Sequence, residues 1–111
     1  MNPVYDEAVI ELRRVAELLR EAKDTREALD AILSHDEAVV WLDEAVINGK
    51  NAETRKAMHT AYIYENAGIV ETRRELRAAT RDVERLDTEE RIARYALRRA
   101  LAADESLVDL R

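Results

Sequence analysis

Two clusters of titratable side chains are the first places to look for chemistry in this sequence. His35, Asp36 and Glu37 are consecutive and are residue types that bind metal ions. Consecutive residues on a helix point in different directions, so these three side chains cannot converge on one ion unaided. The dipole at the start of a capped helix already explains Asp36 and Glu37, because it favours negative charge in the first turn. The sequence therefore predicts no metal site here.

The second cluster is His59 with the nearby Tyr62, Tyr64 and Glu65. His59 and Tyr62 would be neighbours on a helix, whereas Glu65 lies almost two turns further on. Nothing in this spacing orients the imidazole beside a nucleophile, as acid–base or covalent catalysis requires. The chain has no cysteine, which excludes thiol chemistry and thiolate metal ligands. We predict no catalytic residue, no metal, no cofactor and no enzyme activity.

One row of arginines could bind a phosphate backbone. The candidate interaction surface recurs at intervals of four and comprises Arg73, Arg77, Arg81 and Arg85. Acidic residues flank this arginine row, and the net charge of −6 opposes binding to nucleic acid. Residues 1–50 hold twelve acidic and six basic side chains. We therefore expect the arginine row to pair with this acidic half, within one chain or between two, and nucleic acid is the alternative partner.

The composition predicts one helical domain spanning residues 1–111. Two glycines, one proline and 38% charged residues are typical of long helices and coiled coils. The sequence contains no run of about 18 apolar residues and no segment that resembles a signal peptide. We expect a cytoplasmic protein that makes no membrane contact.

Helices are expected over residues 3–23, 25–33, 35–48 and 52–103. Pro3 suits the first position of the first helix. One face of that helix is apolar and comprises Val4, Ala8, Leu12, Val15, Leu19 and Ala22. Capping patterns at Asp24 and Ser34 predict the next two starts, although one continuous helix across Ser34 would also satisfy the apolar spacing.

The clearest predicted break spans residues 48–51. Gly49 can take the left-handed conformation that closes a helix, and Asn51 can cap the next one. We expect Gly49 and Asn51 to form a structural turn between two antiparallel neighbouring helices.

A heptad repeat runs through the last predicted helix. Its expected core and oligomer seam comprises Tyr62, Ile69, Leu76, Val83, Leu86 and Leu97. The capping spacing of Asp87 and Glu90 leaves open a restart of the helix there. The helix before Gly49 can cover only the first part of this seam, so the rest needs the N-terminal helix, a second copy of the chain, or both. The predicted fold is all-α: a helical hairpin, or antiparallel coiled coil, with a long C-terminal helix and an N-terminal helix packed on it. We expect a homodimer or higher oligomer.

Residues 49–57 read G-K-N-A-E-T-R-K-A. They resemble the turn of a group of short helical proteins of unknown function from bacteriophages and prophages, in which an acidic helix, a G-K-N-x-E-x-R-x-A turn and a long Arg/Glu-rich coiled-coil helix follow one another. The resemblance covers residues 34–103, and the turn is its specific part. It implies a phage setting, hence the host cell cytoplasm, in which small acidic helical proteins bind and modulate nucleic-acid machinery. We expect a non-enzymatic adaptor or inhibitor that binds another protein; the alternative is a nucleic-acid accessory factor in phage recombination or replication.

Overall fold

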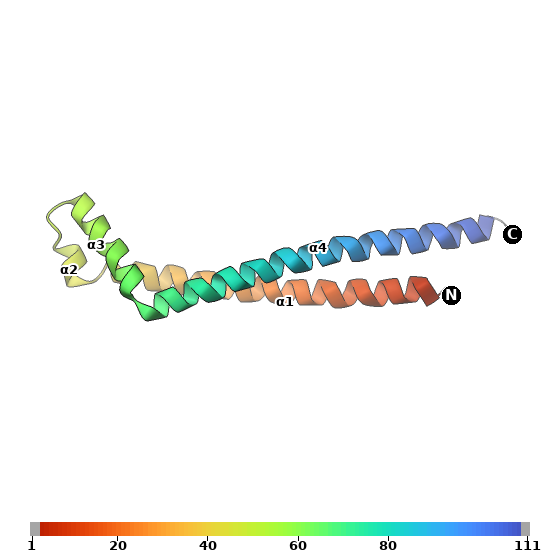
Figure 1. The fold of residues 1–111 in the computed structure, drawn as a ribbon, viewed down its shortest axis with the longest axis horizontal. Coiled ribbons are helices and arrows are strands. Elements are labelled where there is room, and N and C mark those ends of the chain that lie inside the picture. Colours follow the sequence, from red (N-terminus) through yellow and green to blue (C-terminus); the bar gives the residue numbers. More distant parts are fainter. Residues whose placement is uncertain (1–2, 110–111) are drawn as a thin grey trace. The chain divides into compact units, whose positions relative to one another are not determined.

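The computed structural model describes the backbone of residues 3–109 and the side chains of residues 3–43 and 46–103. The described chain is all-α, with α1 (Pro3–Val40), α2 (Glu44–Ile47), α3 (Ala52–Glu65) and α4 (Ala67–Asp109) (Figure 1). It is a helical hairpin in which the N-terminal helix packs against the long C-terminal helix, which confirms the predicted fold class. Its contacts define a terminal unit, the described residues of Met1–Asp24 and Arg81–Arg111, and a central unit, Thr25–Thr80. The single domain predicted from the sequence stays a prediction.

The core of the terminal unit joins the apolar faces of α1 and α4. Leu19 packs with Val83 and Leu86, and the partly buried Ala22 lies against them. Val15 is also buried. These positions recur at three- and four-residue spacings on their own helices, so each helix turns one apolar stripe toward the other. Among the other predicted seam positions of this unit, Leu97 is half-buried.

The central unit has its own set of buried apolar residues. Ile63 of α3, Ile69 of α4 and Val46 of α2 are all buried, and Leu76 is half-buried. Tyr62, predicted as part of the core and oligomer seam, is 38% exposed in the chain. The heptad begins only after α3 has ended, so the buried position of α3 is Ile63 and the phase of the repeat does not extend back to Tyr62.

Helix α1 runs through both predicted boundaries, at Asp24 and at Ser34, and ends eight residues before the predicted end of that segment. Its apolar spacing continues across both sites, and backbone groups inside a helix already have partners, so a capping side chain has no orphan donor to bond. After Val40 the chain tightens into three successive turns. The N–H groups of residues 41, 42 and 43 donate to the carbonyls of residues 38, 39 and 40 at 2.9–3.1 Å.

The helix predicted over residues 52–103 is in fact two helices that meet at Asn66. The Asn66 N–H donates to the carbonyl of Tyr62 at 3.0 Å, and its side-chain Oδ1 accepts from the N–H of Ile69 at 3.0 Å. Asn66 therefore closes α3 and caps α4. A Cβ at Gly68 would lie 3.3 Å from that Oδ1, so glycine leaves the cap room. Helix α4 then continues through Asp87 without the restart that the sequence left open.

The turn before α3 contains the predicted cap but not the predicted glycine conformation. The side chain of Asn51 accepts from the N–H of Thr54 at 2.8 Å, with extended backbone angles (φ −152°, ψ 175°). Gly49 does not have a positive φ. A Cβ at Gly49 would lie 2.7 Å from Cγ of Arg55 and 3.2 Å from its backbone nitrogen. Glycine is needed here for close approach to Arg55, not for a left-handed turn.

Candidate functional site

An open groove of about 700 Å³ lies in the central unit. The end of α1, the turn after it, the end of α3 and the start of α4 form its walls. It is lined by Asp36, Val39, Val40, Leu42, Asp43, Tyr62, Glu65, Asn66 and Ile69. Leu42 is 72% exposed and Val39 is 48% exposed, whereas Ile69 at the base is buried. Such an open surface, which combines apolar and charged side chains, differs from a small-molecule pocket, which encloses most of its ligand.

The groove carries negative charge. Its described lining includes Asp36, Asp43 and Glu65 and no Lys, Arg or His. Neither Asp36 nor Glu65 makes an ion pair with a described residue. The C-terminal ends of α1 and α3 also border the groove, and the last turn of neither helix holds a basic residue. A helix C-terminus carries partial negative charge, so helix ends and carboxylates act in the same direction.

A network centred on Glu37 holds the walls of the groove together. The Glu37 carboxylate Oε1 accepts from Nη2 and Nε of Arg73 at 2.6 and 3.1 Å, which links α1 to α4. The Glu37 carbonyl accepts from Nε2 of His59 at 2.8 Å, which links α1 to α3. The imidazole of His59 stacks on the indole of Trp41, with centroids 3.8 Å apart. The Arg73 guanidinium also lies over the ring of Tyr64, 5.8 Å from its centroid.

These contacts give His59 a structural role. A carbonyl oxygen can only accept, so Nε2 of His59 carries the proton of this hydrogen bond. The consecutive residues 35–37 diverge as their helical spacing predicts: His35 is exposed, Asp36 lines the groove and Glu37 bonds Arg73. Within the described chain, no three His, Cys, Asp or Glu side chains are placed to hold a metal ion.

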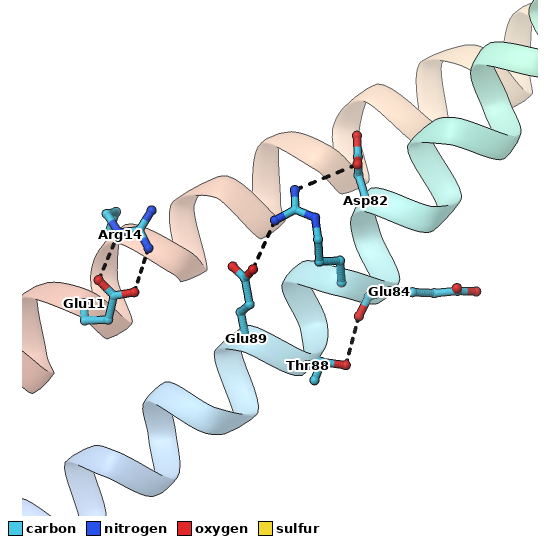
Figure 2. Close-up of polar contacts among 7 residues, drawn as sticks. Glu11, Arg14, Asp82, Glu84, Thr88 and Glu89 are labelled. Atoms are coloured by element: carbon cyan, nitrogen blue, oxygen red, sulfur yellow. Dashed lines mark hydrogen bonds and ion pairs between the residues drawn. The ribbon is translucent and has the colours of Figure 1, made fainter.

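The four members of the arginine row have different surroundings. Arg73 bonds Glu37, so one of the four pairs with the acidic half as expected. In the terminal unit, Arg85 Nη2 lies 3.9 Å from Asp82 Oδ1, and Arg85 Nη1 lies 3.1 Å from Glu89 Oε1. Dashed lines mark both ion pairs in Figure 2. Arg77 and Arg81 are exposed and make no ion pair with a described residue. The row is therefore not a uniform set of available cations.

The terminal unit also carries surface ion pairs along α1. Arg14 donates to Glu11 through Nη2 at 2.6 Å and through Nε at 3.0 Å (Figure 2). This hydrogen bond lowers the pKa of Glu11 and raises the pKa of Arg14. The charge of Glu89 on α4 raises the pKa of Arg14 a little further, so the field of α4 reaches α1 in this unit. The pair is exposed and serves as local helix support.

Sequence reasoning missed the groove because its walls come from two unpredicted helix ends. The sequence predicts a helix over residues 35–48, which includes Trp41 and Leu42, and a long helix over residues 52–103, which includes Asn66. One signal was available: residues 39–42 read V-V-W-L, and four consecutive apolar residues cannot all face one side of a helix. Asn66 followed by Gly68 was a second signal, since asparagine is a preferred helix cap.

In the part of the chain that the structure describes, no helix combines the length and apolar character needed to cross a lipid bilayer. Comparisons with protein-family models, with curated proteins and with solved structures gave no match.

Proposed function

We propose that this chain is a non-enzymatic helical binding protein, an adaptor or inhibitor that engages another protein through the groove of the central unit. The observation that carries the proposal is the open apolar wall formed by Val39, Leu42 and Tyr62. Exposed apolar side chains grouped around one hollow are typical of protein-binding sites, whereas scattered ones are ordinary surface.

The Glu37 network supports this proposal. Preorganised walls bind more tightly because less side-chain freedom is lost on association. Glu37 connects α1 to both α3 and α4, and Trp41 stacks on His59 directly beside the lining residue Leu42. His59 bonds the Glu37 carbonyl and stacks on Trp41, so its role in this proposal is to hold the walls of the groove.

The resemblance of the turn at residues 49–57 extends the proposal to a biological setting. We propose a phage-type protein that works in the cytoplasm of a bacterial host and binds host or phage machinery. We also propose that it assembles with itself. In the terminal unit Ile10, Ile92 and Tyr95 remain exposed, and we propose that a second copy covers Ile92 and Tyr95, which are neighbours on α4.

The experiment is affinity capture from a bacterial lysate with three versions of the tagged chain. We expect wild type to retain a protein partner, Leu42→Glu to lose it, and Ile32→Glu to keep it. Ile32 is a matched control because it is an aliphatic residue of the same unit, 49% exposed, that does not line the groove. If Leu42→Glu retains as much partner as wild type does, the groove is not the binding site.

The alternative, a nucleic-acid accessory factor, has less support. Arg73 and Arg85 are already bonded to carboxylates, and the net charge of −6 repels a phosphate backbone. Retention on DNA that weakens steeply with salt and is lost in Arg77→Glu/Arg81→Glu would favour this alternative instead.

A further inference from the structure

We propose that the groove binds an amphipathic α-helix whose apolar face is flanked by Lys or Arg side chains. This inference rests on the proposed function and names the chemistry of its partner. Helices bind open grooves by inserting apolar residues spaced at three and four positions, and such a helix brings its own apolar surface to cover that of the groove. Leu42 and Val39 need this kind of cover, because both remain largely exposed.

The charge around the groove determines the sign of the partner. Asp36, Asp43 and Glu65 come from three different segments and line the same hollow. Asp36 and Glu65 make no ion pair with a described residue, and neither the described lining nor the last turns of α1 and α3 hold a basic side chain. A helix with basic flanks would place positive charge beside the carboxylates of Asp36 and Glu65.

The positive end of one helix dipole opposes the negative charge of these carboxylates. Helix α4 begins beside the groove, and a helix N-terminus carries partial positive charge. Asn66 already caps this end, because its Oδ1 accepts from the N–H of Ile69 at 3.0 Å. The C-terminal ends of α1 and α3 are hydrogen-bonded as well, because the carbonyls of residues 38–40 accept from the N–H groups of residues 41–43 and the Tyr62 carbonyl accepts from Asn66. The charge of the groove therefore comes mainly from carboxylates such as Asp36 and Glu65, which favour a cationic partner.

The same charges argue against a second copy of this chain as the occupant. A symmetric dimer presents the same patch from both subunits. A dimer packed groove against groove would bring Asp36 and Glu65 close to their own counterparts, and like charges across an interface disfavour association. This groove-to-groove arrangement of two copies is therefore disfavoured.

The test uses the full chain and three synthetic peptides of roughly 18 residues, about five helical turns. One has a leucine face flanked by lysines, one has the same face flanked by glutamates, and one has the lysine composition in scrambled order. None contains tryptophan. Binding is followed by anisotropy of a label on the peptide and by the fluorescence of Trp41, the chain's only tryptophan, which lies beside Leu42.

We expect the lysine-flanked helix to bind and to change the Trp41 emission, and the other two peptides to bind at least about tenfold more weakly. Asp36→Asn/Glu65→Gln should weaken the lysine-flanked helix by about threefold to tenfold, because it removes two exposed charge contacts. The variant should also be less sensitive to salt than wild type. Glu53→Gln is the matched control: it removes an exposed acid of α3 away from the groove and should leave the affinity unchanged. Circular dichroism checks that each variant keeps its helices.

Each contrary outcome has a distinct meaning. Equal binding of the lysine and glutamate peptides, or no binding of the lysine peptide, overturns the basic-helix proposal. If lysate capture still depends on Leu42, the proposed function survives that result. If Leu42→Glu also retains as much lysate protein as wild type does, both the protein-binding groove and its basic-helix partner are refuted. A switch from dimer to monomer in Leu42→Glu would identify a second copy as the occupant and overturn the inference.

Discussion

At the scale of residues, Glu37 links α1 to two other helices of the central unit. Its backbone carbonyl accepts from His59 and its carboxylate accepts twice from Arg73. Both side chains of the ion pair are about one-third exposed, so solvent screens the pair only in part. An ion pair of this kind, joining two helices far apart in sequence, stabilises more than a pair within one helix, because it resists separation of the helices.

We predict a measurable coupling between Glu37 and Arg73. In a double-mutant cycle with Glu37→Gln and Arg73→Gln, the free energy of unfolding should reveal an interaction of about 1 kcal/mol. The control cycle uses Glu71 and Arg74, an exposed pair within α4 at 3.3 Å, whose coupling should not exceed about 0.5 kcal/mol. Urea unfolding followed by circular dichroism supplies both values. Equal coupling in the two cycles would show that the Glu37 pair is an ordinary surface contact.

At the scale of elements, the junction between α3 and α4 shapes the groove. Asn66 ends one helix and begins the next, and both Tyr62 and Glu65 line the groove because α3 ends where it does. If the chain were one helix from residue 52 onward, Tyr62 would continue the heptad and lie in the seam, as its spacing predicts.

Substitution of Asn66 by alanine distinguishes these two arrangements by the sign of its effect. Loss of the cap should lower the free energy of unfolding by about 1 kcal/mol, and Asn66→Asp, which keeps an acceptor oxygen, should cost much less. A continuous helix would respond in the opposite way, because alanine is the better helix former. Chemical denaturation gives the sign. A gain in stability and helix content for Asn66→Ala would contradict the capped junction.

At the scale of the whole molecule, the exposed apolar side chains of the terminal unit bear on assembly. The core cluster of the terminal unit consists of Leu19, Val83 and Leu86, with Ala22 beside it. A helix gains most of its stability from tertiary packing, and two helices alone offer each other only one face. Ile92 and Tyr95 lie three residues apart on the surface of α4, on adjacent positions that another copy can cover.

We therefore predict concentration-dependent self-association through the terminal unit. Sedimentation velocity over roughly 1–100 μM should show a dimer or larger species that dissociates on dilution, as mass action requires. Ile92→Glu should shift this equilibrium toward monomer, while Leu42→Glu should leave it unchanged. A chain that remains monomeric at the highest concentration would refute self-association.

Much of this molecule follows from contacts between near neighbours in sequence, and those parts were predictable. The three- and four-residue spacing of Val15 and Leu19, and the heptad spacing of Val83 and Leu86, place these side chains in the core as expected. The cap at Asn51 was also predictable, because its hydrogen bond reaches only three residues along the chain. Such features depend on the helical repeat and on local donors and acceptors, which any segment carries with it.

The groove depends on contacts that no local pattern contains. Glu37 meets Arg73 across 36 positions and His59 across 22, and Trp41 stacks on a ring from a different helix. These long-range contacts accompany the end of α1 at Val40, where the local apolar spacing would have continued the helix. Helix propensity differs by only about 0.7 kcal/mol between ordinary residues, so tertiary contacts of similar size can move a helix end by several residues. The helices could therefore be predicted from the sequence, and local signals marked two of their ends, whereas the groove that these ends enclose depends on long-range packing.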